Sequence, residues 1–367
     1  MKFVNKLFAV FLIISSIALY SASDTYAAVS TEPQIPEFSI RYIDVGQGDA
    51  ALIQCDGHYM LIDGGPSEKS SKIYSILKDE GITKLDYIIA THPDADHIGG
   101  LSGALNYAST EVCYCTVNSH DTKTFRNLTK YLKKQNISIT IPKTNTEIAL
   151  GKATISFLDP GDGARGNIAL TQGTVLGAEE LNESIIVRID YGQNSFLFMA
   201  DAETEEENRL LKNGKNLDCD VLKVAHHGSS SSSSPKFLKA VSPKYAIISV
   251  GKENSYGHPT QDTLDNLSAT GATVLRTDLH GDITVTSDGK EITVLTEKSS
   301  AQAAALGTLS VVPGPETTYV LNSNTKKFHY PTCSSVYDIK TKNRQDVTLT
   351  REEIIEMGYV PCKRCHP

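Results

Sequence analysis

The chain lacks an excess of positive charge, a hydrophobic run long enough to span a membrane, and the cysteine spacing of a disulfide-rich domain. Its 367 residues carry 35 Lys and Arg against 43 Asp and Glu, a formal net charge of −8. This balance excludes a protein whose whole surface binds nucleic acid. The apolar run at 7–20 is too short for a comfortable membrane span. The seven cysteines show no disulfide framework.

The N-terminus has the layout of a secretory signal. Lys2 and Lys6 precede the apolar run, and small residues follow it up to Ala28. We therefore expect a signal peptide over 1–28 and a secreted, extracellular protein that can stay associated with the cell envelope. We expect a monomer with no integral membrane domain after cleavage, and an uncleaved anchor is the alternative.

The most informative segment is Thr91-His92-Pro93-Asp94-Ala95-Asp96-His97-Ile98-Gly99-Gly100. It follows the apolar run 85–90, which predicts a buried strand, and α/β folds place their chemistry in loops at the carboxyl ends of such strands. Carboxylates this close repel one another unless a cation lies between them. The segment therefore predicts a metal-binding loop, and a solvated polar turn is the alternative.

Strand and helix patterns are mixed along the chain up to about residue 298. The expected strands are 38–45, 51–55, 59–62, 85–90, 184–189, 195–199, 221–225 and 245–250. The expected helices are 70–80, 124–135, 204–212 and 261–270. This order favours an α/β layered domain. The serine run 229–234 predicts a flexible loop that can touch substrate, and the composition of 299–318 predicts a linker.

Four further motifs accompany the metal loop in a fixed order. They are Tyr42-Ile43-Asp44-Val45-Gly46-Gln47-Gly48-Asp49-Ala50, Met60-Leu61-Ile62-Asp63-Gly64-Gly65, Val221-Leu222-Lys223-Val224-Ala225-His226-His227-Gly228-Ser229 and Asn254-Ser255-Tyr256-Gly257-His258-Pro259. Over about residues 38–296, the chain resembles metallo-β-lactamase-fold hydrolases of the ComEC competence-protein type. The resemblance implies a hydrolase domain over 35–298, an α/β (α+β) four-layer αββα sandwich with metals at the edge between two sheets.

The resemblance also implies a binuclear metal site. Its ligands would be His92 and Asp94 on one metal, Asp96 and His97 on the other, Asp201 as the bridge, and His258. Asn182 stands where the general fold has a further histidine, so the first metal lacks a ligand. One of His226 and His227 can fill the gap while the other donates a proton. We expect His227 as the ligand and His226 as the acid, with the reverse left open.

Other polar residues of these motifs are expected to support the loop by hydrogen bonds. They are Asp44, Gln47, Asp49 and Asp63. The usual glycine before the bridging aspartate is Ala200 here, a small departure from the pattern.

Two divalent metals can activate a water at neutral pH and hold both oxygens of a phosphodiester. Zinc and manganese both suit the mixed histidine and carboxylate ligands, and Asp96 can also orient the water. We expect a secreted metal-dependent phosphodiesterase, with DNA as the first-choice substrate. One alternative is a cell-envelope enzyme, since the opening motifs also resemble a phosphorylcholine esterase of teichoic acids. The other is a non-catalytic DNA-binding protein.

The C-terminal segment carries His329-x-x-x-Cys333 and, much later, Cys362-x-x-Cys365. These spacings predict one structural zinc ion, with His366 as a competing fourth ligand. The segment from about 319 to 367 resembles the metal-binding domain of Ada-type DNA repair proteins. That family has its methyl-accepting cysteine where His329 stands, so the resemblance implies metal-stabilised DNA contact without methyl transfer. The excess of basic residues is modest, and a solvated surface is the alternative.

Overall fold

The computed structural model describes residues 37–161 and 184–298, and most of 317–362 with gaps at 330–332, 337–338, 350–353 and 356. The predicted signal peptide, residues 299–316 of the predicted linker, Asn182, Cys365 and His366 lie outside the described residues. Within these ranges, no helix is long and apolar enough to cross a membrane.

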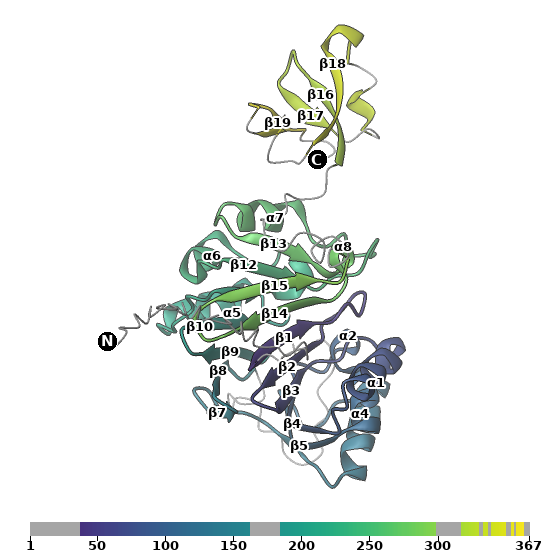
Figure 1. The fold of residues 1–367 in the computed structure, drawn as a ribbon, viewed down its shortest axis with the longest axis vertical. Helices are drawn as coiled ribbons and strands as arrows, with labels where there is room; N and C mark the ends of the chain where they lie inside the picture. Colours follow the sequence, from purple (N-terminus) through teal and green to yellow (C-terminus); the bar gives the residue numbers. More distant parts are fainter. Residues whose placement is uncertain are drawn as a thin grey trace, which may run out of the picture. The chain divides into compact units, whose positions relative to one another are not determined.

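Two sheets form the centre of the larger part of the chain (Figure 1). The eight-stranded sheet has the order β15 (Ile292–Thr296), β14 (Ile283–Ser287), β1 (Phe38–Tyr42), β2 (Ala51–Cys55), β3 (His58–Ile62), β4 (Lys84–Ala90), β5 (Ser109–Cys115) and β6 (Ile139–Thr140). The seven-stranded sheet has the order β13 (Thr273–Arg276), β12 (Tyr245–Ile248), β11 (Val221–Lys223), β10 (Asn194–Phe198), β9 (Ile186–Tyr191), β8 (Ala153–Asp159) and β7 (Glu147–Leu150).

Apolar side chains from both sheets form one buried cluster between them. The ring centroids of Phe38 and Phe196 lie 5.0 Å apart, and those of Tyr42 and Phe198 lie 5.6 Å apart. Burial of such rings is a main stabilising contribution, because free energy scales with the apolar area removed from water.

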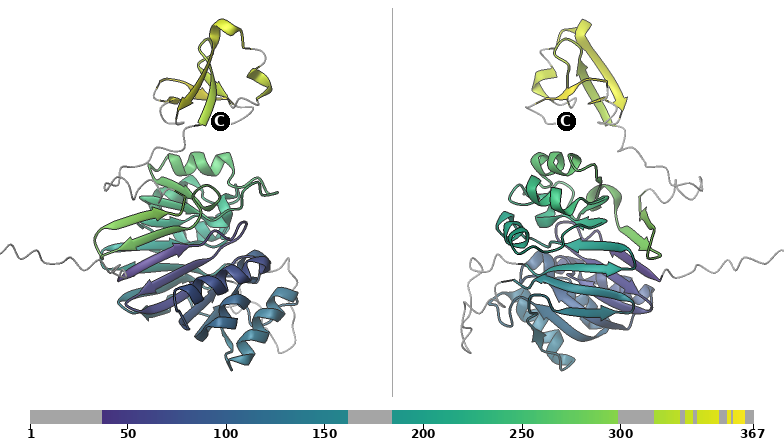
Figure 2. Two further views of the ribbon diagram at one scale, coloured as in Figure 1. Left: turned by 45° about the vertical axis from the view of Figure 1, so that its right-hand side comes forward. Right: turned by 90° about the vertical axis from the view of Figure 1, so that its left-hand side faces the viewer.

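Helices cover the outer face of each sheet (Figure 2). The helices packed on the eight-stranded sheet are α1 (Ser70–Asp79), α3 (Leu101–Tyr107) and α4 (Lys123–Lys134). Those on the seven-stranded sheet are α5 (Thr204–Lys212), α6 (Pro235–Val241) and α7 (Gln261–Ser268). The shorter elements are η1 (Ser67–Lys69), α2 (Ala95–Ile98), η3 (Ala225–Gly228) and α8 (Thr277–His280). The predicted four-layer αββα sandwich is confirmed.

Local chemistry explains where these elements begin and end. Asp56 and Gly57 have φ values of 51° and 82°, as the two-residue hairpin turn between β2 and β3 requires. Helix α4 is capped by Thr122, whose side-chain oxygen accepts a hydrogen bond of 3.2 Å from the backbone N–H of Phe125. The four helices predicted from periodicity are present, with ends within two residues of the predicted ones.

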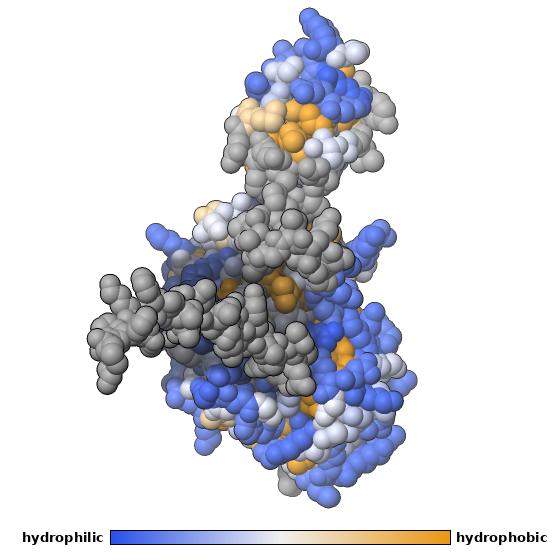
Figure 3. Space-filling model, viewed as in Figure 1, coloured by the Kyte–Doolittle hydropathy of each residue, from blue (hydrophilic) through white to orange (hydrophobic). Residues whose placement is uncertain are grey.

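The C-terminal part contains its own four-stranded sheet with the order β18-β16-β17-β19. Its elements are β16 (Thr317–Asn322), β17 (Lys327–His329), η4 (Ser334–Val336), η5 (Thr341–Asn343), β18 (Arg344–Leu349) and β19 (Val360–Pro361). A small core includes Tyr319, Phe328 and Tyr359. Apolar side chains also gather on the visible surface of this part (Figure 3). Among its described residues, the exposed large apolar side chains are Ile355, Met357 and Val360.

Candidate metal centre

The metal loop begins where β4 ends and is held by the buried carboxylate of Asp63. Both the backbone N–H and the hydroxyl of Thr91 donate to Asp63, at 2.9 and 2.7 Å. The same carboxylate lies 2.9 Å from His97 Nδ1. Asp94 is the residue before α2, whereas Asp96 and His97 lie on this short helix. Asp63 therefore fixes both the course of the loop and the orientation of the His97 ring.

Two glycine-containing turns pack against the loop and leave no room for larger residues. A Cβ atom at Gly48 would lie 2.1 Å from the carbonyl oxygen of Asp96, and the φ of Gly48 is +125°. The N–H of Asp49 donates to that same oxygen at 3.2 Å, and the N–H of Gly64 donates to the carbonyl of His97 at 2.7 Å. The metal loop is therefore clamped by the segments that follow β1 and β3.

The predicted supporting residues divide into two pairs. The expected hydrogen bonds to the loop are confirmed for Asp49, through its N–H, and for Asp63. Gln47 instead accepts from the N–H of Gly251 at 3.2 Å. Asp44 accepts from the N–H of Gly46 in its own turn.

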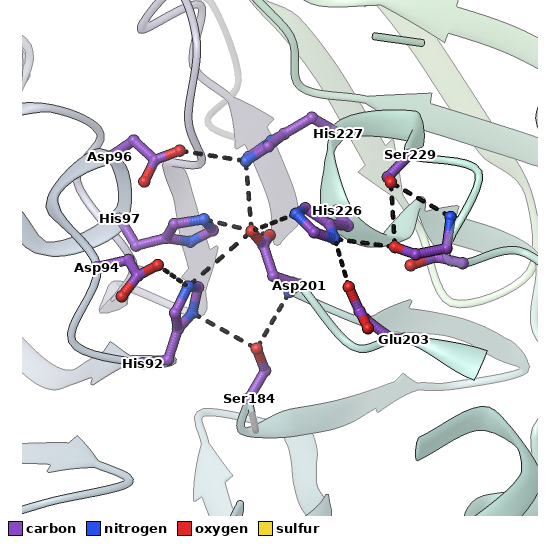
Figure 4. Close-up of polar contacts among 12 residues, drawn as sticks. His92, Asp94, Asp96, His97, Ser184, Asp201, Glu203, His226, His227 and Ser229 are labelled. Atoms are coloured by element: carbon purple, nitrogen blue, oxygen red, sulfur yellow. Dashed lines mark hydrogen bonds and ion pairs between the residues drawn. The ribbon is translucent and has the colours of Figure 1, made fainter. Parts of the chain in front are cut away.

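Four histidine rings point their Nε2 atoms at the carboxylate of Asp201, which follows β10 (Figure 4). His97 Nε2 lies 3.2 Å from Asp201 Oδ1. The Nε2 atoms of His227, His226 and His92 lie 3.6, 3.7 and 3.9 Å from Oδ2. Residues that are far apart in sequence thus converge on one carboxylate at the edge between the two sheets.

Like His97, the other three histidines each direct Nδ1 at a nearby oxygen outside the centre. Their Nε2 atoms therefore point inward. His92 Nδ1 lies 3.1 Å from Thr91 Oγ1 and 3.4 Å from Ser184 Oγ. His227 Nδ1 lies 3.0 Å from the carbonyl oxygen of Ser249. Such outer contacts fix the ring orientation and tautomer of metal-binding histidines.

The Nδ1 atom of His226 faces the rim of the site. It lies 3.4 Å from Glu203 Oε1 and 3.3 Å from Ser231 Oγ. The φ values of His226 and His227 are 48° and 53°, a left-handed conformation that is costly for residues with a Cβ. This backbone directs consecutive rings apart, so that His227 is 3% exposed and His226 is 32% exposed.

Several inward-facing atoms are buried and make no hydrogen bond. Among the described residues they include His97 Nε2, His227 Nε2 and Asp201 Oδ1. They are held by charge, since His97 Nε2 lies 3.2 Å from Asp201 Oδ1 and His227 Nε2 lies 3.4 Å from Asp96 Oδ2. The ligand atoms within 4.8 Å of one another form overlapping groups, which include His92–His97–Asp201, Asp96–His97–His227 and Asp49–Asp201–His227. This set of imidazole nitrogens and carboxylate oxygens fits divalent metal ions.

The buried carboxylates and histidines of this centre strongly shift one another's pKa values. Burial alone would raise the pKa of Asp201, but the surrounding histidines, His97 first, hold it well below its usual value. Burial alone would lower the pKa of His227, yet nearby carboxylates, Asp201 first, raise it to about 10. Burial and then His97 lower the pKa of His92 to about 4. A metal cation can replace the protons that balance these carboxylates.

Two predicted ligands lie at the margin of these groups. Asp94 Oδ2 is 3.7 Å from His92 Nε2, and its side chain is 58% exposed. His258 belongs to none of the ligand groups found among the described residues. Its ring centroid lies 5.8 Å from that of His226. The role of His258 as a ligand stays a prediction.

Two residues of the site were not identified from sequence. Ser184 accepts a hydrogen bond from the N–H of Asp201 at 3.1 Å, and its hydroxyl also faces His92. In sequence it follows, by two residues, the position where the general fold has a further histidine ligand. Glu203 caps α5 through a capping box while its carboxylate faces His226. The sequence around Glu203 shows only the pattern of a helix cap, so its contact with His226 could not be predicted.

The serine run 229–234 is a loop, as predicted, but it is largely packed and hydrogen-bonded. Ser232 and Ser233 are only 3% and 1% exposed. The backbone N–H groups of Ser233 and Ser234 donate to the buried carboxylate of Glu207, and the Ser232 hydroxyl donates to the carbonyl of Ala202 at 2.8 Å. Hydrogen bonds that the serine-rich composition does not reveal hold this segment.

A separate group of candidate ligands lies in the C-terminal part. It consists of His329, Cys333 and Cys362, all buried, with ligand atoms within 4.8 Å of one another. His329 Nδ1 has no hydrogen-bond partner, and burial followed by the charge of Lys327 lowers the pKa of this ring. These three residues come together as predicted.

The Metallo-beta-lactamase superfamily profile matches residues 43–252. With its four-layer sandwich, the chain therefore belongs to the metallo-β-lactamase superfamily. The predicted resemblance is confirmed at this level, whereas the Ada-type resemblance of the C-terminal segment stays a prediction.

The chain is also similar to competence proteins. It is 28% identical over 278 residues to ComE operon protein 3 of Bacillus subtilis (strain 168), covering 70% of this chain and 33% of that protein. It is 30% identical over 258 residues to Competence protein ComA of Neisseria gonorrhoeae, covering 69% of this chain and 33% of that protein. The chain thus spans about a third of the length of these relatives.

A solved structure with a similar fold is that of the metallo-beta-lactamase fold protein YhfI from Bacillus subtilis. The alignment covers 70% of this chain and all of YhfI, with 16% identity and a TM-score of 0.42.

Proposed function

We propose that this protein is a secreted, divalent-metal-dependent phosphodiesterase that hydrolyses DNA. The observation that carries the proposal is the convergence of imidazole Nε2 atoms and carboxylate oxygens around Asp201, with buried ligand atoms that make no hydrogen bond. The names of the relatives, which refer to competence and, in Haemophilus influenzae, to recombination, support DNA as the substrate.

The metal ligands would be His92, Asp94, Asp96, His97, Asp201 and His227, with His258 as a further candidate. Two divalent metal ions bound there would activate a water and neutralise the charge of the phosphodiester. Zinc and manganese both match the ligand set, because imidazole suits zinc and carboxylate suits manganese.

The two adjacent histidines have different tasks in this proposal. His227 is buried and lies 3.4 Å from Asp96 Oδ2, which suits a ligand. His226 is partly exposed at the rim, where it can hold a proton at Nε2 and donate it to the leaving oxygen. The contact between its Nδ1 and Glu203 keeps Nε2 directed at the substrate side. Asp96 would orient the attacking water.

In the C-terminal part, His329, Cys333, Cys362 and Cys365 would hold one structural zinc ion. The three described residues supply a histidine nitrogen and two sulfurs, the ligand types of structural zinc sites. The turn before β17 carries Lys326 and the strand itself begins with Lys327, and these two side chains would contact a DNA backbone.

The activity is tested by removing metal with a chelator and adding back zinc or manganese. The substrates are linear DNA and bis(p-nitrophenyl) phosphate. We expect hydrolysis of both to depend on added metal. Asp96→Asn should lose more than about a hundredfold, since changes outside the ligand shell already cost about 10- to 100-fold.

Asp86→Asn is the matched control, because Asp86 pairs with the exposed His58 at 3.0 Å outside the site. Its activity should equal that of the wild type. Metal-independent hydrolysis, or equal activity of the two variants, would contradict the proposal.

A further inference from the structure

The most exposed large apolar or aromatic side chain among the described residues is Tyr256, at 67%. Aromatic rings on protein surfaces normally bury most of their area, because exposing it to water forfeits the hydrophobic contribution. The core of the sandwich does not use this ring. Its position, in the segment between β12 and α7, therefore calls for a role outside folding.

Tyr256 lies in a line of rings that ends at the candidate metal centre. Its ring is nearly parallel to that of His258, at an interplanar angle of 26° and a centroid distance of 5.8 Å. The His258 ring is in turn 5.8 Å from that of His226. His226 Nε2 lies 3.7 Å from Asp201 Oδ2. The exposed ring thus stands at the rim of the site where the phosphodiester would be held.

The backbone around Tyr256 is held in place although the side chain is exposed. Asn254 Oδ1 accepts hydrogen bonds from the N–H groups of Tyr256 and His258, at 3.2 and 3.1 Å. Asn254 Nδ2 donates to the carbonyls of Gly251 and His258. A ring presented on a fixed turn loses little conformational freedom when a ligand covers it.

We propose that Tyr256 is a stacking platform for an unpaired nucleobase next to the scissile phosphate. The inference rests on the proposed function, since it names the part of the substrate that this rim would bind. Every base has an apolar face, so stacking on an aromatic ring tolerates any sequence. A base can reach the ring only when it is unpaired, and the platform therefore selects single-stranded ends or segments over intact duplex.

The chain contains no tryptophan, which allows a direct optical test. Tyr256→Trp introduces one indole, and a stacked base quenches indole fluorescence. The probe is a short single-stranded phosphorothioate oligonucleotide, which resists hydrolysis. Its partner is the same strand with abasic sites. Leu295→Trp, at a position on β15 that is 47% exposed, is the control for collisional quenching.

We expect the base-containing strand to quench the Tyr256→Trp protein and the abasic strand to leave its fluorescence unchanged. In a binding assay with the same strands, Tyr256→Ala should bind the base-containing strand about five- to a hundredfold more weakly. Tyr256→Phe keeps the ring and should stay within about twofold of the wild type.

Equal quenching by both strands, or an equal loss of affinity in Tyr256→Ala and Tyr256→Phe, would overturn the platform. Wild-type hydrolysis of bis(p-nitrophenyl) phosphate is measured alongside. Hydrolysis without base-dependent quenching rejects the platform alone, whereas absence of hydrolysis with zinc or manganese rejects the proposed function and the inference with it.

Discussion

At the scale of single residues, the carboxylate of Asp63 is the main support of the metal loop. It receives two hydrogen bonds from Thr91 and faces His97 Nδ1. Outer contacts of this kind change metal affinity about 10- to 100-fold when they are removed. We expect Asp63→Asn to lower metal affinity by that factor, as measured by competition with a chromophoric chelator.

Asp86→Asn is again the matched control, because it changes a His–Asp pair outside the site with a similar distance, 3.0 Å against 2.9 Å. If Asp63→Asn and Asp86→Asn bind metal equally well, Asp63 does not orient a ligand.

The adjacent histidines give a second prediction at this scale. His227→Ala should lower the metal content, because it removes a buried nitrogen that lies between Asp96 and Asp201. His226→Ala should keep the metal and lower kcat about 10²- to 10⁴-fold, the contribution of general acid catalysis. Metal analysis of both purified variants, together with their kcat values, checks the division.

A substrate with a good leaving group sharpens this test. It needs little protonation, so His226→Ala should recover much of its rate there while His227→Ala should not. Equal metal loss in the two variants would refute the assignment.

At the scale of elements, Asp282 joins three separate parts of the eight-stranded side. Its side chain is 6% exposed and accepts from Arg41 Nε at 2.8 Å, Lys72 Nζ at 2.8 Å and the N–H of Asp44 at 2.9 Å. Asp282→Asn should lower the free energy of unfolding by about 2 kcal/mol. This is less than the roughly 3–5 kcal/mol of a fully buried pair, because Arg41 and Lys72 stay partly hydrated. Glu111→Gln, in an exposed pair with Lys84, should cost less than about 0.5 kcal/mol.

The same contact predicts a pH dependence. Burial alone would raise the pKa of Asp282, but Lys72, the Asp44 N–H and Arg41 outweigh it and lower the pKa. A carboxyl group with a lowered folded pKa contributes stability above its unfolded pKa of about 3.9 and loses it as the pH falls through the folded value. The stability difference between wild type and Asp282→Asn, from denaturant unfolding, should therefore shrink below about pH 4. A constant difference from pH 7 to pH 3 would contradict this.

Local patterns predicted some elements well and others not at all. Helix α4 has three-and-four spacing of Phe125, Leu128 and Leu132, all buried, and its period is visible without any tertiary knowledge. Strand β11 was predicted two residues too long at its C-terminal end, because the buried Val224 precedes η3 and the buried Ala225 begins it. Apolar residues at this position predict burial, but they do not predict where the hydrogen-bonded strand ends.

The site shows the same limit. His92 and His97 lie within one loop, so their proximity could be read from spacing. Asp201 and His227 were placed by resemblance, because only the fold brings the ends of β10 and β11 to that loop. Ser184 and Glu203 contact the histidines through side chains whose local sequence has an ordinary structural explanation.

At the scale of the whole molecule, the proposed function assigns hydrolysis to the metallo-β-lactamase domain and DNA binding to the C-terminal part. Deleting the residues after Thr318 should leave hydrolysis of small phosphodiesters intact and weaken binding to long DNA. The lost part should be the salt-sensitive one, since phosphate contacts release counterions, and several contacts change affinity about tenfold or more over a few-fold rise in salt.

Cys333→Ser should reproduce the deletion, because loss of a ligand unfolds a small zinc-dependent segment. The measurement is DNA affinity at several salt concentrations. An unchanged salt slope after truncation would show that the C-terminal part does not contact DNA.

The central claim is that Asp201 is the shared ligand of a two-metal phosphodiesterase. The most direct measurement combines metal stoichiometry with DNA hydrolysis while zinc or manganese is titrated into chelated wild type and Asp201→Asn. We predict that wild-type activity rises until about two metal ions are bound per chain, and that Asp201→Asn loses both tight metal binding and hydrolysis. Full activity with no bound metal, or unchanged stoichiometry in Asp201→Asn, would contradict the account.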